Sequence, residues 1–334
     1  YVVLTAKHHE GFCLWDSKFT DYKSTNTPAG KDFIKEYVDA FRAEGLKVGF
    51  YYSLIDWHHP DYTIDSRHPQ RQESDAEYER LNTGKDMNRY REYMKNQVRE
   101  LLTNYGEISI IWFDFSFPGK NGKGRSDWDS ENLLKLARSL QPGIIVDDRL
   151  DLRDVEGGWD FTTPEQVKVA KWPEVNGKRV PWETCQTFSG SWGYYRDETT
   201  WKSPAQLIEL LVESVSKGGN LLLNIGPTPE GAVPAPCSRI LRQVGAWLGQ
   251  YGPSVYEATD PMPQEWSILG AFTRKGDTLY FHCNRYPGDE LAIGGLVCDV
   301  KSARLMGGPK LKVTQVRDRV VVSGLPAQAP DPLD

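Results

Sequence analysis

The stretch Ile108–Asp114 constrains the fold more than any other part of the chain. Its sequence, ISIIWFD, is rich in β-branched and aromatic residues and contains neither glycine nor proline, and Gly106 comes shortly before it. This pattern predicts a buried strand of a parallel sheet. The strand ends on the carboxylate of Asp114, and polar groups at the carboxyl ends of barrel strands line active sites. We therefore expect Asp114 to be a catalytic nucleophile.

Strand patterns alternate with helical patterns over residues 1–250. The strand patterns occur near residues 1, 48, 108, 144, 160, 183 and 221. Such alternation predicts parallel βαβ units and an α/β fold. A closed (β/α)8 TIM barrel needs eight strands and about 250 residues. Seven strands are visible, so we expect the first barrel strand to lie upstream of Tyr1, with an open seven-unit sheet as the alternative.

The pattern changes after Gly252. Short runs of alternating polar and apolar residues follow, including one at 266–272, and turn signals such as Lys275-Gly276-Asp277 separate them. These runs predict an antiparallel β-sandwich. We therefore expect a catalytic barrel domain at residues 1–252 and a C-terminal β-sandwich domain at residues 253–334.

Composition argues against several functional classes. The net charge of -6 and the lack of a basic tract argue against nucleic acid as a partner, and no apolar run approaches the ~18 residues of a membrane span. The five cysteines, an odd number without a C-x-x-C pair, indicate neither a disulfide framework nor a zinc knuckle. His8-His9 lacks the further ligands that a zinc site needs. We expect no metal and no cofactor; a homo-oligomer is compatible with the sequence.

A sugar-cleaving role for Asp114 requires a second carboxyl group. In retaining glycosidases one carboxylate attacks the anomeric carbon, and a second carboxyl group with a raised pKa protonates the leaving oxygen. Asp148, Glu165 and Glu183 each lie at or just past a predicted strand. Asp148 adjoins Arg149. The positive charge of Arg149 favours the ionised carboxylate, so we expect Asp148 to be a poor acid. Arg149 itself suits sugar hydroxyls or Asp114. The residues alone leave Glu165 and Glu183 open.

Seven segments carry motifs that belong together. They are LTAKHHEGF (4–12), GFYYSLIDWHHPDY (49–62), IWFDFSFP (111–118), DDR (147–149), FTTPEQ (161–166), PWETCQTFSGSWGY (181–194) and LLLNIGPTPEG (221–231). In this order the set resembles glycoside hydrolase family 29, the α-L-fucosidases, and the C-terminal part resembles that family's β-sandwich. The resemblance implies a retaining exo-α-L-fucosidase that acts on fucosylated glycans through a covalent fucosyl-enzyme. It also favours a secreted or periplasmic location.

The resemblance implies roles for individual residues. Asp114 matches the family nucleophile, and Glu165 is assigned as the acid/base, with Glu183 as the alternative. The implied sugar contacts are His8, His9, Tyr52, Trp112, Arg149 and Trp192. The family's first-strand motifs and last sandwich strand have no counterpart here, which agrees with the count of seven strands.

Two other functions stay open. One is an α-L-galactosidase, because L-galactose differs from L-fucose only by a hydroxyl at C6, and a hydrophobic pocket rejects an added hydroxyl weakly. The other is a sugar-binding fragment without catalysis, which an incomplete barrel with exposed strand edges would favour.

Overall fold

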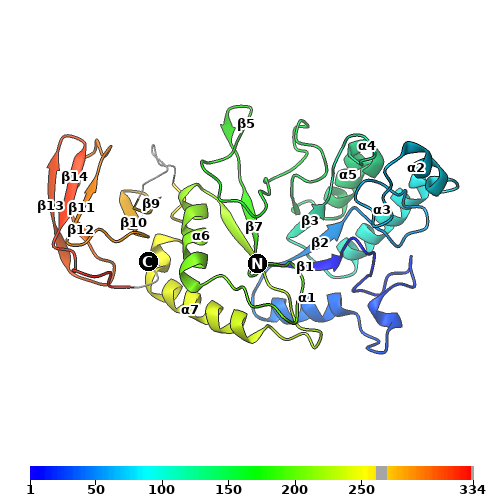
Figure 1. Cartoon of the computed structure of the whole chain (residues 1–334), viewed down its shortest axis with the longest axis horizontal. Coiled ribbons are helices and arrows are strands. Elements are labelled where there is room, and N and C mark those ends of the chain that lie inside the picture. Colours follow the sequence, from blue (N-terminus) through cyan, green and yellow to red (C-terminus); the bar gives the residue numbers. More distant parts are fainter. Residues whose placement is uncertain (261–268, 332–334) are drawn as a thin grey trace. The chain divides into compact units, whose positions relative to one another are not determined.

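The structure, a computed structural model, describes residues 1–260 and 269–331. Contacts divide the chain into two compact units, Tyr1–Thr162 and Thr163–Asp334, and each is described by itself. The predicted strand at 266–272 lies partly outside the described residues, as does the end of the chain at 332–334. Figure 1 labels most of the helices and strands.

The first unit is built on a four-stranded parallel sheet in the order β1-β2-β3-β4. Its strands are β1 (Val2–Lys7), β2 (Val48–Ser53), β3 (Ile110–Asp114) and β4 (Ile145–Val146), and Figure 1 labels the first three. Every residue of β3 is buried, which confirms the predicted buried strand. Because the strands are parallel, their carboxyl ends share one edge of the sheet, and Asp114 lies at that edge.

Helices accompany this sheet, and all but one of them bury apolar residues in a cluster that also contains residues of the strands. The helices are α1 (Phe33–Ala43), α2 (Asp75–Asn82), α3 (Met87–Thr103), α4 (Arg125–Trp128) and α5 (Ser130–Leu140), with a 3-10 turn η1 (Ser24–Asn26). Helices α1 and α3 confirm the helices that the sequence pattern predicts between the strands. Helix α2 gives no clear helical pattern in the sequence, because Tyr78 alone of its residues is buried. Its visible signal is Ser74, whose side chain caps the helix by accepting from the Glu77 backbone N–H.

The strand expected at 159–162 is wrong as a full strand. Phe161 and Thr162 are bridge residues only, and Phe161 forms an isolated parallel bridge with Asp147. The Asp160 carboxylate accepts the backbone N–H of Val146 at 2.8 Å, so a side chain takes a donor that a neighbouring strand would otherwise pair.

The second unit contains a parallel pair, β7 (Glu183–Thr187) with β8 (Asn220–Asn224), joined through helix α6 (Pro204–Ser216). This confirms a predicted βαβ connection. Ser203 caps α6 and forms a capping box with Gln206. A short hairpin, β5 (Glu174–Val175) with β6 (Lys178–Arg179), precedes β7, and α7 (Ala235–Tyr251) and the 3-10 turn η2 (Gly252–Ser254) follow β8.

Antiparallel strands follow, as predicted. Strands β9 (Ala271–Lys275) and β10 (Thr278–His282) pair with each other, and β11 (Glu290–Ile293), β12 (Ala303–Arg304), β13 (Lys310–Val316) and β14 (Arg319–Ser323) form a sheet in the order β11-β14-β13-β12. Ala271 of β9 packs in one apolar cluster with Val215 of α6 and Trp247 of α7. The boundary at 252/253 and the sandwich packing of the sheets stay predictions.

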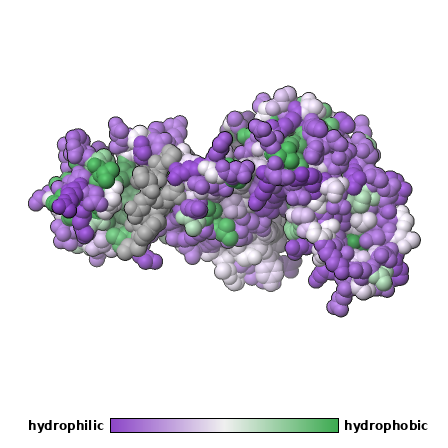
Figure 2. Space-filling model, turned by 90° about the horizontal axis from the view of Figure 1, so that it is seen from above, coloured by the Kyte–Doolittle hydropathy of each residue, from purple (hydrophilic) through white to green (hydrophobic). Residues whose placement is uncertain are grey.

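The surface is mostly polar. Figure 2 shows hydrophilic residues over most of the visible face, with apolar residues in small groups. Within residues 1–260 and 269–331, no helix has the length and apolar character needed to cross a bilayer. The five cysteines are all free thiols.

Candidate active site

Asp114 ends β3 with both carboxylate oxygens held by donors. The Tyr51 hydroxyl donates to Oδ2 at 2.5 Å, and Nη1 of Arg149 donates to Oδ1 at 2.7 Å. Asp114 is 7% exposed, so the two contacts lie in a largely water-poor setting. Hydrogen bonds to a charged carboxylate are short and directional. The donors therefore fix the orientation of the Asp114 carboxylate.

A stack of rings supports these donors. The rings of His8 and Tyr51 are stacked at 5.6 Å, and those of Tyr51 and Trp112 are also stacked at 5.6 Å. The Arg149 guanidinium lies over the Trp112 ring, 4.3 Å from its centroid. Trp112 is only 4% exposed. It thus supports Tyr51 on one side and Arg149 on the other, beside the carboxylate that both contact.

His9 presents a neutral imidazole to this region. Its Nδ1 lies 2.6 Å from Oγ of Ser53, and that hydroxyl donates its own hydrogen to the Ile55 carbonyl at 2.9 Å. The Ser53 oxygen must therefore accept from His9 Nδ1–H, which leaves Nε2 as an acceptor. Burial, and then the neighbouring His8, lower the pKa of His9 to about 3. A neutral ring with a free acceptor suits a sugar hydroxyl.

A buried ion pair between Lys7 and Asp56 helps to position His8 and His9. Lys7, the last residue of β1, lies 3.1 Å from the Asp56 carboxylate, and both side chains are almost fully buried. The other Asp56 oxygen accepts the backbone N–H groups of His58 and His59. The backbone N–H of Trp57 also donates to the His9 carbonyl at 2.7 Å. The turn after β1 is thereby tied to the loop after β2.

The structure does not place Tyr52, one of the implied sugar contacts, beside Asp114. Tyr52 is fully buried, and its hydroxyl donates to Gln97 of α3 at 2.8 Å. Successive residues of a strand point to opposite faces, and the β2–β3 register pairs Tyr51 with Trp112 and Ser53 with Asp114. Tyr51, which sequence reasoning missed, is therefore the tyrosine on the Asp114 face. The spacing of Asp114 and Trp112 shows which face matters, but not which tyrosine shares it.

The aspartates after β4 occupy buried positions. Asp147 accepts the Phe113 backbone N–H at 3.0 Å, and burial, followed by the neighbouring Asp148, raises its pKa well above the ordinary range. Asp148 forms an ion pair with Arg153. Asp147 supports the backbone of β3 one residue before Asp114.

The two candidate acids belong to the second unit. Glu165 is exposed, and its neighbours are tied to β7: Cys185 donates to the Pro164 carbonyl at 3.2 Å and accepts from Gln166 N–H at 3.0 Å. Glu183 lies inside β7, 2% exposed, and its Oε1 has no hydrogen-bond partner among the described residues. Burial raises the pKa of Glu183 to about 7. Glu165 therefore has access, whereas Glu183 has the raised pKa.

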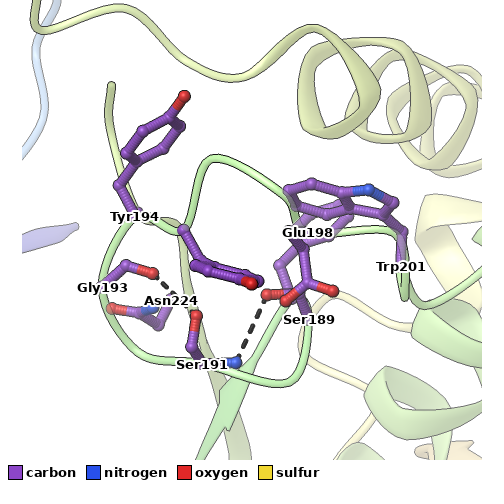
Figure 3. Close-up of a pocket in the computed structure, with 10 residues that line it drawn as sticks. Ser189, Ser191, Gly193, Tyr194, Glu198, Trp201 and Asn224 are labelled. Atoms are coloured by element: carbon purple, nitrogen blue, oxygen red, sulfur yellow. Dashed lines mark hydrogen bonds between the residues drawn. The ribbon is translucent and has the colours of Figure 1, made fainter. Parts of the chain in front are cut away.

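Trp192 lies on the loop that follows β7. It is exposed, and its carbonyl accepts from the Asn224 side chain at 2.7 Å, which ties the loop to the end of β8. Beneath the loop is a cavity of about 10 Å³, bordered by the groups that Figure 3 shows, including Ser191, Glu198 and Trp201. That volume holds roughly one water molecule. The exposed Trp192 ring, rather than this cavity, is the surface that a sugar could contact.

The structure thus brings together Asp114, Trp112, Arg149, His8 and His9 in the first unit. It places Glu165, Glu183 and Trp192 in the second unit. Among the residues that the structure describes, no group of three or more His, Cys, Asp or Glu side chains could hold a metal ion.

Comparison with known proteins gives one family. The family model described as Alpha-L-fucosidase matches residues 1–253. The plasma α-L-fucosidases of Rattus norvegicus and Homo sapiens are 33% and 32% identical to this chain, over 77% of its length in each case. The matches cover 53% and 52% of those two proteins. The chain therefore spans about half the length of these relatives.

Solved structures agree. α-L-fucosidase isoenzyme 1 from Paenibacillus thiaminolyticus is 43% identical, with a TM-score of 0.91 over 100% of this chain and 81% of that chain. A GH29 α-L-fucosidase from Bacteroides thetaiotaomicron, trapped as a covalent intermediate with 2-fluoro-fucosyl fluoride, is 29% identical, with a TM-score of 0.83 over 99% of this chain and 76% of that chain. By sequence and by fold, the chain belongs to the α-L-fucosidase family, glycoside hydrolase family 29.

Proposed function

We propose that this protein is a retaining exo-α-L-fucosidase that removes terminal α-L-fucose from glycans. The observation that carries the proposal is the Asp114 carboxylate at the end of β3, oriented by Tyr51 and Arg149. Family membership indicates that the sugar is fucose, and the oriented carboxylate is suited to act as the nucleophile. The covalent intermediate trapped in the Bacteroides thetaiotaomicron relative supports the double-displacement route.

In the first step an Asp114 oxygen attacks the anomeric carbon of fucose. The bond from that carbon to the leaving oxygen breaks, and the acid/base carboxyl group, assigned to Glu165, donates its proton to that oxygen. In the second step the carboxylate of Glu165 removes a proton from a water molecule. The water oxygen attacks the anomeric carbon, and the bond from that carbon to Asp114 breaks. Two inversions give net retention of configuration.

The remaining residues of the site would bind the sugar. His9 offers an acceptor at Nε2, and exposed His8 lies beside it, their ring centroids 4.0 Å apart. Arg149 has donors beyond the one that contacts Asp114. Trp112 is a supporting surface, and we assign the exposed ring of Trp192 to the methyl side of fucose. Each assignment has two supports: the chemical character of the side chain in the structure, and a position that the family resemblance implies.

The barrel and the domain division belong to this proposal. The parallel strands β1–β4 and the β7–β8 pair with its α6 crossover support a (β/α)8-type TIM barrel. The family match ends at residue 253, which supports a catalytic domain at 1–252 and a β-sandwich domain at 253–334. The proposed partner is a fucosylated oligosaccharide or glycoconjugate.

The direct test is hydrolysis of an aryl α-L-fucoside, with an aryl α-L-galactoside alongside. We expect clear turnover of the fucoside, with the α-anomer as the first product by NMR. Faster turnover of the galactoside would replace the proposal with an α-L-galactosidase. Binding of fucose without turnover of either substrate would favour a non-catalytic sugar-binding fragment.

The acid/base assignment predicts different behaviour for two variants. Glu165→Gln should lower kcat/KM on a fucosyl oligosaccharide by about 10²–10⁴-fold, with a much smaller loss on α-L-fucosyl fluoride, because fluoride leaves without protonation. Added azide should then yield the α-fucosyl azide, since the nucleophile is intact. Glu183→Gln is the matched comparison in the same unit.

Glu183 is the second candidate because burial raises its pKa to about 7. If Glu183 is the acid, Glu183→Gln shows the losses expected for Glu165→Gln. The wild-type kcat on the oligosaccharide then falls as pH rises through about 7, because a general acid must be protonated to act. That pair of results would move the assignment to Glu183.

Tyr51→Phe is expected to lower kcat by roughly 10- to 100-fold, because it removes a hydrogen bond to a charged carboxylate. Tyr52→Phe is the matched control: it removes the hydroxyl that contacts Gln97 in the core and should lower the melting temperature while kcat stays near wild type. Steady-state kinetics and thermal unfolding of both variants measure this. The reverse result would show that the β2 face assignment is incorrect.

A further inference from the structure

Arg67 presents an unpaired cation beside the site. It is exposed, and its guanidinium carbon lies 5.5 Å from the ring centroid of Phe115 and 5.7 Å from that of Phe117. Both distances are within the range of a cation–π contact. Among the described residues, no acceptor forms a hydrogen bond or ion pair with this side chain. By contrast, Arg89 and Arg125 each contact an aspartate.

A buried ion pair holds the turn that carries Arg67. The backbone N–H of Arg67 donates to Oδ1 of Asp65 at 2.8 Å. Oδ2 of Asp65 accepts from Lys123 at 2.6 Å and from the Tyr62 hydroxyl at 2.5 Å. Asp65 and Lys123 are 2% and 3% exposed, and burial lowers the pKa of Lys123. Burying two charges costs desolvation free energy, so the role that we give this pair is structural: it fixes the position of the Arg67 backbone.

Phe115 connects Arg67 to the nucleophile. It directly follows Asp114 and has a φ of +88°, a conformation that non-glycine residues rarely adopt. Its ring meets the edge of the His9 ring at 5.0 Å and that of Phe117 at 5.5 Å. A continuous row of contacts therefore runs from His9 through Phe115 to the Arg67 guanidinium, and Arg67 lies at its exposed end.

We propose that Arg67 binds an anionic group, a carboxylate or a sulfate, on the glycan from which fucose is removed. A guanidinium offers parallel N–H donors that match two oxygens of such a group. The cation–π contacts with Phe115 and Phe117 hold the guanidinium group in place before the ligand binds. The inference rests on the proposed function and narrows it: acidic fucosylated glycans are the preferred substrates.

The test compares fucosyl oligosaccharides of the same linkage whose neighbouring sugar is neutral, carboxylated or sulfated. The measured quantity is the ratio of kcat/KM for the acidic glycan to that for the neutral one. We expect a wild-type ratio of about ten or more, declining as salt rises. Arg67→Met keeps the apolar stem on the rings and removes the charge, so its ratio should fall to about one.

Arg71→Met is the matched control: Arg71 is an exposed arginine four residues along the chain, and no ring among the described residues lies over its guanidinium. Its ratio should equal that of the wild type. Arg67→Lys keeps the charge but loses the planar fork, so an intermediate ratio is expected. A preference for the carboxylated or for the sulfated glycan alone supports the proposal and identifies the anion.

The outcomes separate this inference from the proposed function. Turnover of α-L-fucosyl fluoride with a wild-type ratio near one overturns the role of Arg67 and leaves the fucosidase in place. An equal loss on acidic and neutral glycans in Arg67→Met also overturns it. Without turnover of the fluoride, the fucosidase proposal fails, and calorimetric Kd values for the same glycans decide: equal affinities in wild type and Arg67→Met refute anion binding.

Discussion

Asp114→Ala should lower kcat on an aryl α-L-fucoside by about four orders of magnitude or more, the largest effect expected of any substitution in this protein. The carboxylate that would form the covalent bond is lost, and Tyr51 and Arg149 are left without their acceptor. Steady-state hydrolysis measures the loss. Circular dichroism of the variant verifies that the fold survives.

Azide distinguishes loss of the nucleophile from general damage to the site. In Asp114→Ala, azide can enter the space of the missing carboxylate and attack the anomeric carbon once, which yields the β-fucosyl azide. Glu165→Gln should instead yield the α-fucosyl azide. Activity of Asp114→Ala close to wild type, or formation of the α-azide by it, would refute the assignment of the nucleophile.

Lys7→Met is expected to lower the free energy of unfolding by about 3–5 kcal/mol, because it leaves the buried Asp56 carboxylate without its counter-ion. Urea unfolding of the full chain measures the change. Adding Asp56→Asn should recover part of the loss, since an amide oxygen can still accept from His58 and His59 without carrying a charge.

Lys35→Met is the control for this prediction. Lys35 pairs with Asp39 on α1, and both side chains are more than half exposed, so solvent screens the pair and little stability should be lost. A Lys7→Met variant as stable as Lys35→Met would show that the buried pair contributes nothing. Loss of activity without loss of stability would assign Lys7 to the site alone.

Local patterns predicted most strands of the first unit because the spacing of apolar residues along the chain reflects which residues are buried. Strand β3, apolar up to Asp114, and the amphipathic α1 and α3 each carry their signal within one short segment. Helix α2 was missed because one buried tyrosine gives no periodicity. The strand expected at 159–162 was wrong as a full strand: Asp160 N–H donates to the Val146 carbonyl, but the Val146 N–H is taken by the Asp160 side chain instead of a strand carbonyl.

The site divides in the same way. Asp114 could be found from the sequence because a carboxylate at the end of a buried strand is a local feature. The choice between Tyr51 and Tyr52 depends on how β2 and β3 register, and two adjacent tyrosines look alike without that register.

By itself, the sequence determined the alternation of the main strands and helices, the family and the strand-end carboxylate. Only the tertiary structure decided the contacts between distant segments. Lys7 meets Asp56 across 49 positions, and Lys123 meets Asp65 across 58. A residue's periodicity records which face is buried. Its partner depends on strand register and packing, which no local pattern encodes.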